Sequence, residues 1–409
     1  MAGSGIGMHG GKYGKGTSSK NKIERNQTKE RKIAVFSRGY MDINFFLIVI
    51  TLLVIGIVMM FSASYAKALS ETGGADGTVY AVKQIIMAGI GLVALFFFSY
   101  FDYRNFARPK IAIPLFVLCL GLLVAVLVLG DTENGATRWM MIGPINFQPS
   151  EIMKLSVIIL FSYLVVQNYD NMDKFRVGIV PFGVLLGMVD GLLMLEPHLS
   201  CTLLTSIVGV AIIFVGGVRW KHIGILVAVG AGLIALVVLY KIQSEGFTYF
   251  ATRFQSWLDP FSDEKGGTWQ TTQSLIAIGS GGVFGLGLGG SRQKFMYLPE
   301  SQNDFVFSIV CEELGFIGAV TVIILFMMLV IRGLYIATRA QDRFGMLITV
   351  GITVQVGVQA FLNIAVVSNL IPNTGISLPF FSYGGTALIM QLAEMGIILN
   401  VSKNAAIDT

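Results

Sequence analysis

The chain has 409 residues, of which 54% are hydrophobic and only 13% are charged. This composition excludes an ordinary soluble domain, in which about 25% of residues are charged. The net charge of +5 is concentrated in residues 1–42, and the nearly neutral remainder argues against a nucleic-acid-binding surface.

The basic N-terminal tail, residues 1–42, is rich in Gly, Ser and Lys and lacks an apolar core. Such a composition predicts disorder. We expect this tail to lie in the cytoplasm, to fix the orientation of the chain and to contact anionic lipid, with a specific protein partner as the alternative. The first apolar run starts too late and is too long for a cleaved signal peptide.

Ten apolar runs follow the tail, each close to the ~20 residues that a membrane-spanning helix needs. The sequence therefore predicts an all-α integral membrane protein with about ten transmembrane helices, whereas a transmembrane β-barrel would show short alternating segments. The predicted spans are 43–66, 80–100, 111–130, 151–167, 177–195, 199–217, 222–240, 304–331, 346–368 and 384–402.

The distribution of Lys and Arg predicts the orientation of these spans. More of them fall in segments on the side of the N-terminus, so both termini are predicted to be cytoplasmic. The chain then divides into the tail, a polytopic membrane domain over 43–402 and a cytoplasmic C-terminus over 403–409. The largest loop, 241–303, is predicted to be extracytoplasmic.

Charged residues inside the predicted spans are costly, and they are therefore functional candidates. Glu151 and Lys154 share one helix face at i, i+3 spacing. They form either a structural ion pair or a polar surface on which Lys154 binds phosphate. Glu394, in the last span, has no obvious partner in the sequence.

Two segments on the predicted outer face carry most of the candidate chemistry. Residues 273–315 place Asp304 at the mouth of an apolar helix. Glu312 and Glu313 follow about two turns later; at most one of them can face the same cavity, and Glu312 is better placed. The segment 369–385 is rich in Pro, Gly and hydroxyls, so it cannot be lipid-exposed backbone. We expect it to form the opposite wall of one site.

Gly285, Gly287 and Gly290 fit the pattern G-x-G-x-x-G. That pattern indicates dinucleotide binding only between a strand and a helix of a βαβ unit, and it lies here in a loop of a helical membrane chain. We therefore interpret these glycines as the source of backbone freedom in a tight re-entrant or surface turn.

Cysteine and histidine indicate no disulfide framework and no metal centre. The cysteines lie in separate apolar runs, as small buried side chains do, and the histidines lack metal-ligand spacing. No Ser-His-Asp or Cys-His set can be assembled on one side of the membrane. The residues concerned are Cys119, Cys201, Cys311, His9, His198 and His222.

A series of motifs runs through the chain: TRWM at 137–140, GPINFQPSEIMKL at 143–155, RFQSWLDP at 253–260, QSLIAIGSGG at 273–282, GLGGSRQKFMYLPE at 287–300, NDFVF at 303–307, EELG at 312–315 and PNTGISLPFFSYGG at 372–385. With these motifs, residues 40–402 resemble the SEDS family (shape, elongation, division and sporulation), which includes FtsW, RodA and SpoVE. The GLG-x-S-x-QK pattern is more similar to the FtsW and SpoVE branch than to the RodA branch.

The resemblance implies ten transmembrane helices and a peptidoglycan glycosyltransferase of the bacterial cytoplasmic (inner) membrane, which polymerises lipid II outside the membrane. It also implies a class B penicillin-binding protein, a transpeptidase, as partner, together with other divisome proteins. By the family pattern LPE-x-x-x-D-F, Asp304 is the catalytic residue. The chain departs from the family where His198 and Ser200 replace the usual Asp and Gly, and where Asn303 replaces Thr.

In such a reaction a sugar 4-hydroxyl attacks an anomeric carbon and expels undecaprenyl diphosphate. A positioned base contributes ~10²–10⁴-fold, and Asp304 is the candidate: a helix start favours its ionised form, whereas Phe305 and Phe307 would desolvate it. Positive side chains, or a shared divalent cation (Mg²⁺ or Mn²⁺) without a dedicated site, would stabilise the diphosphate. The candidate substrate-binding residues are Lys154, Arg253, Arg138, Glu151, Gln273, Lys294, Glu300, Glu313, Ser377 and Ser382.

Two other functions stay open at the level of sequence. Many spans with buried charges also suit a transporter that flips lipid II, although the two halves show no inverted repeat. A scaffold that only recruits the transpeptidase is the second alternative.

Overall fold

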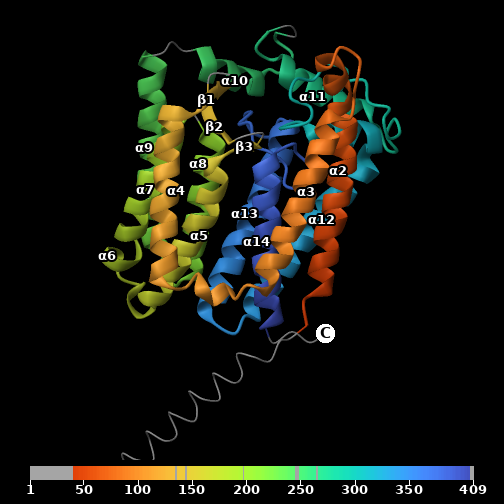
Figure 1. The fold of residues 1–409 in the computed structure, drawn as a ribbon. Helices are drawn as coiled ribbons and strands as arrows, with labels where there is room; N and C mark the ends of the chain where they lie inside the picture. Colours follow the sequence, from red (N-terminus) through yellow and green to blue (C-terminus); the bar gives the residue numbers. More distant parts are fainter. Residues whose placement is uncertain are drawn as a thin grey trace, which may run out of the picture. The chain divides into compact units, whose positions relative to one another are not determined.

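The structure, a computed structural model, describes residues 40–133, 136–142, 145–196, 198–244, 248–263 and 266–405. Met41–Thr409 forms one compact unit (Figure 1). Except for Tyr40, Met41 and Asp42, the predicted tail lies outside the described residues, as do the last four residues of the chain. The long helices are α2 (Ile43–Glu71), α3 (Val79–Tyr100), α4 (Pro109–Leu129), α5 (Pro149–Gln167), α7 (Val180–Leu195), α8 (Leu199–Val215), α9 (Trp220–Ser244), α12 (Val306–Thr338), α13 (Arg343–Val367) and α14 (Gly385–Lys403).

Eight stretches of the described helices are long and apolar enough to cross a membrane, and one of them joins the short α6 (Phe175–Gly178) to α7. The shorter apolar helices α8 and α9 occupy the other two predicted positions. The prediction of an all-α membrane protein is thus confirmed. α2 and α12 extend further at their C-terminal ends than predicted, because residues that favour helix continue past each apolar run.

Local sequence explains where several helices begin. The side chain of Asp42 accepts a hydrogen bond from the backbone N–H of Phe45, 2.8 Å away, and caps α2. Asp342 caps α13 in the same way through Gly345. Pro109 and Pro149 occupy the first position of α4 and α5, where a missing N–H costs nothing.

The structure also contains elements that the sequence did not predict. Three short antiparallel strands, β1 (Asp131–Glu133), β2 (Ala136–Ile142) and β3 (Ile145–Phe147), form a sheet in the order β1-β2-β3 between α4 and α5. Short 3₁₀ turns, η1 (Tyr103–Asn105) and η2 (Tyr169–Asn171), follow α3 and α5. Except for β2, each of these elements has only three residues, too few for a hydrophobic pattern to be recognised in the sequence.

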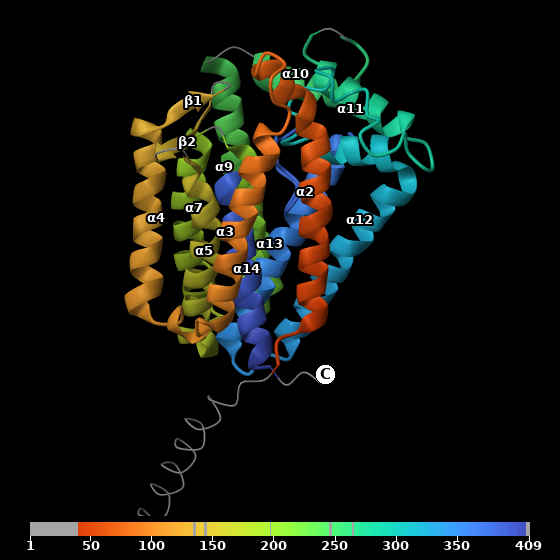
Figure 2. The same cartoon turned by 45° about the vertical axis from the view of Figure 1, so that its right-hand side comes forward.

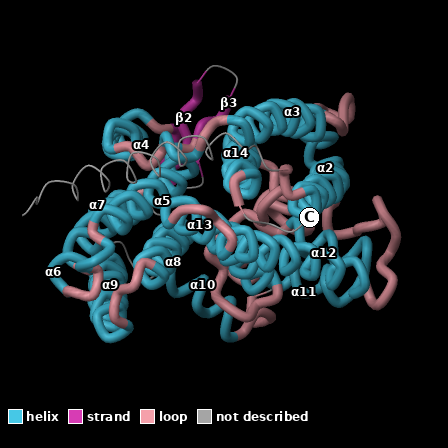
Figure 3. The backbone as a smooth tube through the Cα atoms, turned by 90° about the horizontal axis from the view of Figure 1, so that it is seen from below, coloured by secondary structure: helices cyan, strands magenta, loops and turns pink. Residues whose placement is uncertain are grey.

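Three helices form the interior of the described bundle. In α5 and α14, 78% of the most apolar window is buried, and in α13 72%, against 28% in α3, α4 and α12. Seen from below, α5, α13 and α14 lie between the other helices (Figure 3). A Cβ on Gly396 of α14 would lie 2.4 Å from the carbonyl oxygen of Leu95, so this glycine permits the close contact with α3.

The two short helices α10 (Thr248–Leu258) and α11 (Trp269–Ser280) lie at one end of the bundle, and the first residues of α2 and the last of α14 lie at the other (Figures 1 and 2). A hydrogen bond from the Asp42 N–H to Ser402 Oγ, 3.2 Å, joins these two helix ends. Within the described part of the predicted 241–303 loop, the end of α9, α10 and α11 are helical, whereas residues 281–303 are not.

Candidate active site

Asp304 lies between the loop that follows α11 and the first residue of α12. Its backbone is fixed from two sides: Asn363 Nδ2 of α13 donates to the Asp304 carbonyl oxygen at 2.7 Å, and Ser382 Oγ donates to that of Asn303 at 2.6 Å. Asn363 also donates to Ile376 O at 2.6 Å. α13 therefore joins the segment that carries Asp304 to the segment 369–385. These are the two segments that the sequence predicted to form opposite walls of one site.

Asp304 is half-buried, so protein surrounds it without covering it completely. A Cβ on Gly375 would lie 3.2 Å from Asp304 Oδ2, so the absence of a side chain there gives the carboxylate its space. Within the described residues it accepts no hydrogen bond. Burial raises the pKa of Asp304 to about 6; the Glu300 carboxylate adds to this rise, and the charges of Arg138 and Arg253 oppose it.

Arg253 reaches the site from α10. Its Nη1 donates to the carbonyl oxygen of Asn373 at 2.6 Å. Asn373 donates to Gln270 Oε1 of α11 at 3.0 Å, and its own Oδ1 accepts from the Gly375 N–H at 3.0 Å. These contacts place the guanidinium of Arg253 beside the turn that contains Gly375 and thus near Asp304.

Arg138 approaches from strand β2. Its Nε donates to the Glu196 carbonyl oxygen at 3.4 Å. Burial raises the pKa of Glu196 to about 8, and the charge of Arg138 partly opposes the rise. Burial and the charges of Arg138 and Lys154 lower the pKa of His198, whose Nε2 lies 3.3 Å from Gln148 Nε2. His198, the departure from the family pattern, is thus an uncharged neighbour of Arg138.

Lys154 and Glu151 form a buried ion pair, with Nζ and Oε2 2.9 Å apart. Lys154 also donates to Gln359 Oε1 at 3.4 Å, and Gln359 Nε2 donates to Ser377 Oγ at 3.2 Å and Ser377 O at 3.1 Å. The pair is therefore connected to the 369–385 segment through the amide of Gln359.

Gln273, another candidate, is buried on α11.

Glu300, Lys294 and Ser382 have partners within the protein. Glu300 lies 3.6 Å from Lys67 Nζ and accepts from Asn303 Nδ2 at 2.6 Å. Lys294 is buried and paired with Glu313 at 2.9 Å. Ser382 accepts from the Leu378 N–H at 2.7 Å. Of these three side chains, the Glu300 carboxylate is the one that acts on Asp304 electrostatically.

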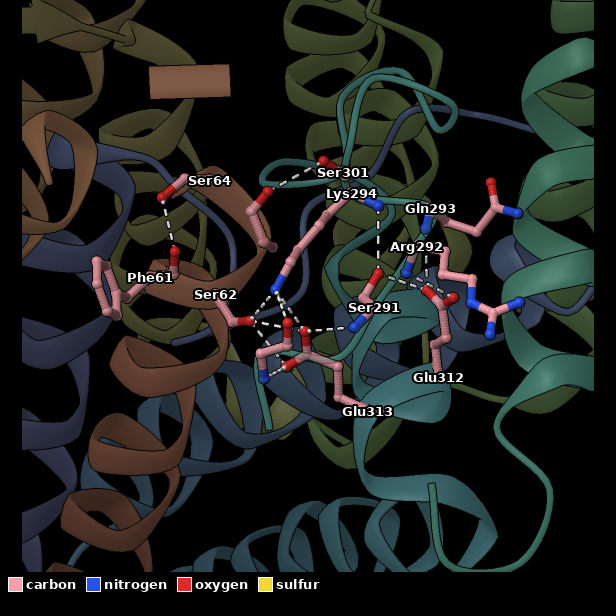
Figure 4. A network of polar contacts seen from close by, with 12 residues as sticks. Phe61, Ser62, Ser64, Ser291, Arg292, Gln293, Lys294, Ser301, Glu312 and Glu313 are labelled. Carbon is pink, nitrogen blue, oxygen red and sulfur yellow. Dashed lines mark hydrogen bonds and ion pairs between the residues drawn. The ribbon is translucent and has the colours of Figure 1, made fainter. Parts of the chain in front are cut away.

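The sequence allowed at most one of Glu312 and Glu313 to face the cavity of Asp304 and favoured Glu312, but the structure gives both carboxylates another partner. Both carboxylates bind the loop after α11 (Figure 4). Glu313 accepts from the Gly289 and Ser291 N–H groups at 3.0 and 3.2 Å, and Glu312 accepts from the Arg292 N–H at 3.0 Å. The helical spacing counted from Asp304 does not apply, because α12 begins only at Val306, and the loop after α11 folds against the break at Gly315.

Sequence reasoning missed the polar face of α13. Gln355, Gln359 and Asn363 are buried and spaced four residues apart, so they share one face of an apolar helix. Gln355 donates to both oxygens of Glu394 at 2.9 Å, which supplies the partner that the sequence did not reveal. The i, i+4, i+8 spacing of three amides in a membrane span was the available signal.

Within the described residues, no group of three or more His, Cys, Asp or Glu side chains is arranged to hold a metal ion. The residues around Asp304 offer cationic side chains and backbone carbonyls instead. They suit an anionic group placed next to a carboxylate.

The fold and these contacts define a multi-pass membrane protein with a charged site. The site lies at one end of the helix bundle, and α2 begins at the other end. The sequence model of the family described as "Cell cycle protein", which covers FtsW, RodA and SpoVE, matches residues 42–407, and the chain belongs to this family.

Named relatives agree with this assignment. The chain is 41% identical to "Stage V sporulation protein E" of Bacillus subtilis (strain 168) over 373 residues, which are 88% of this chain and 97% of the relative. It is 36% identical to "Probable peptidoglycan glycosyltransferase FtsW" of Geobacter sp. (strain M18), over 89% of this chain and 97% of that protein.

Solved structures show the same fold. A chain from the work titled "Structural coordination of polymerization and crosslinking by a peptidoglycan synthase complex" matches with a TM-score of 0.72 and 28% identity, over 90% of this chain and 99% of that one. The rod shape determining protein RodA of Thermus thermophilus matches with a TM-score of 0.63 and 27% identity, over the same shares.

Proposed function

We propose that this protein is a peptidoglycan glycosyltransferase that polymerises lipid II, with Asp304 as the general base. The observation that carries the proposal is the Asp304 carboxylate: it has a pKa of about 6, accepts no hydrogen bond within the described residues and lies near two arginines. The relatives named as peptidoglycan glycosyltransferases support the reaction class.

Each part of the reaction has a residue suited to it. The carboxylate of Asp304 removes the proton of the acceptor 4-hydroxyl as its oxygen forms a bond to the anomeric carbon of the donor sugar. The bond from that carbon to the diphosphate oxygen breaks, and its electron pair leaves with undecaprenyl diphosphate. Arg138 and Arg253 offset the negative charge that develops on this leaving group.

A pKa of about 6 suits this base. At neutral pH most of the carboxylate is ionised, yet it accepts a proton more readily than an exposed aspartate with its usual pKa of about 3.9. We assign Lys154 a supporting role in binding the diphosphate from beneath the site. A divalent cation, Mg²⁺ or Mn²⁺, would add positive charge at the same oxygens.

We further propose that the protein works in the bacterial cytoplasmic membrane, with Asp304 on the extracytoplasmic face and both chain ends in the cytoplasm. A class B penicillin-binding protein is the proposed partner, because the solved chain with a TM-score of 0.72 comes from a peptidoglycan synthase complex whose title names both polymerization and crosslinking.

Asp304→Asn tests the proposal. The amide has nearly the same shape but cannot accept the proton, so polymerisation of labelled lipid II by the purified protein should fall at least about 100-fold. Binding of substrate should change much less. Asp304→Glu should also be poor, since displacement of the carboxylate by about 1 Å can cost ~10²-fold.

Asp259→Asn and Asp263→Asn are matched controls, because both residues are exposed in the loop between α10 and α11. They should retain most activity. Normal polymer from Asp304→Asn would refute the assignment, and equal loss in all three variants would indicate a general need for loop charge. Movement of lipid II between leaflets without polymer would instead identify a flippase.

A further inference from the structure

The loop between α11 and α12 lies beside the membrane-spanning part of α12. We name residues 281–297 the re-entrant loop. Its backbone pairs with α12 on both sides of the break at Gly315: the Leu286 N–H donates to Glu312 O at 3.0 Å, and the Phe316 N–H donates to Gly282 O at 2.9 Å. Beyond this break, α12 continues as an apolar helix from Phe316 to Thr338.

The contact with α2 shows how deep the re-entrant loop lies along that helix. Ser62 Oγ donates to Glu313 Oε1 at 2.7 Å and accepts from Lys294 Nζ at 3.1 Å. Ser62 precedes the last residue of α2 by nine positions, or about 13 Å of helix. Its neighbours Phe61 and Tyr65 are exposed on an apolar helix. The re-entrant loop therefore lies below the outer end of α2.

The backbone of the re-entrant loop is satisfied within the protein. Ten backbone N–H groups between Gly285 and Phe295 donate hydrogen bonds to other protein atoms. Glu312 and Glu313 accept four of these bonds through their carboxylates (Figure 4 shows this network). The four donors are the backbone N–H groups of Gly289, Ser291, Arg292 and Gln293. The Ser291 hydroxyl also donates to Glu312.

The side chains of the re-entrant loop contrast with its backbone. Phe284 is 82% exposed and Leu288 62% exposed, although both are large and apolar. Phe316 and Ile317 continue this apolar surface onto α12. The exposed large apolar side chains of the loop are Val283, Phe284, Leu286, Leu288, Phe295, Met296 and Tyr297.

We propose that the re-entrant loop inserts into the outer part of the bilayer, with lipid acyl chains as the occupant of its apolar surface. Non-helical backbone at membrane depth is tolerated only where protein covers its polar groups, and here α12 and the loop itself accept the backbone N–H bonds while the apolar side chains face outward. The exposed Arg292 extends toward the lipid headgroups while its stem stays in the apolar layer.

Depth-dependent fluorescence quenching tests this proposal independently of catalysis. Phe284→Cys and Leu288→Cys variants of the full chain are labelled with an NBD fluorophore in nanodiscs. The native Cys119, Cys201 and Cys311 are buried, so the introduced thiol reacts preferentially. Ser262→Cys, exposed in the loop between α10 and α11, is the matched control.

Lipids brominated on their acyl chains should quench the labels at 284 and 288 several-fold more than the label at 262, and an aqueous quencher should show the reverse order. Equal quenching by lipid at the three positions would overturn the proposal. Labels at 284 and 288 that are shielded from both quenchers would also overturn it, because a protein surface would then cover the loop. Unchanged thermal unfolding of each labelled variant confirms that the fold is retained.

Discussion

At the scale of single residues, the acidity of Asp304 results from opposing neighbours. Burial and Glu300 raise its pKa, whereas Arg138 and Arg253 lower it. The sequence alone predicted that Asp304, Arg138 and Arg253 lie on the same side of the membrane and identified them as candidates, because motifs and charged residues can be recognised without knowing the fold. The partners of Asn363 and Ser62 were not predictable, since each bond joins residues distant in the chain.

The pH dependence of kcat/KM follows from this balance. A base must be ionised, so kcat/KM should fall about tenfold per pH unit below a pKa of about 6. Glu300→Gln removes a negative charge that raises the pKa of Asp304, and the acidic limb should move to lower pH. Asp259→Asn should leave the limb in place. An unmoved limb in Glu300→Gln would show that Asp304 is not the group that titrates.

The buried pair of Lys154 and Glu151 predicts two separable effects. Lys154→Ala leaves Glu151 buried without its ion-pair partner, at a cost of about 3–5 kcal/mol of stability, and polymerisation should be lost. The double variant Glu151→Gln/Lys154→Met removes both charges and should recover thermal stability. Activity should stay low if Lys154 binds diphosphate, whereas recovered activity would mean that the pair is purely structural.

At the scale of elements, apolar runs predicted the membrane helices because length and hydropathy are local properties. The break in α12 was not predicted, although the glycines of the re-entrant loop were interpreted as a tight re-entrant or surface turn. The break depends on contacts between segments: a Cβ on Gly285 would lie 2.1 Å from Glu313 O, and Gly285 has a φ of +81°.

Gly285→Ala should therefore destabilise the protein by at least about 1–3 kcal/mol, through backbone strain and the contact with α12. Gly279→Ala is the matched control in α11, because nothing lies within 4 Å of its added Cβ. That variant should be neutral or more stable by up to ~1 kcal/mol. Thermal unfolding in detergent compares the two, and equal stability would contradict the close packing.

At the scale of the whole molecule, the bond between Asp42 and Ser402 places the first and last described helix ends together, and α10 and α11 lie at the opposite end. The charge distribution predicts that the former end is cytoplasmic. A cysteine within 258–268 should then react with an impermeant thiol reagent added to intact cells. A cysteine within 1–40 should react only after lysis, and the reverse pattern would invert the orientation of the site.

The burial of α14 has a consequence for biogenesis. This helix follows all the other described helices in chain order, yet 78% of its most apolar window is buried among them. α3 and α13, inserted earlier by the translocon, cannot reach their final packing until α14 arrives between them. Nascent chains should therefore stay incompletely packed in the bilayer until α14 inserts. The polar face of α13 would be the last part to be covered by protein.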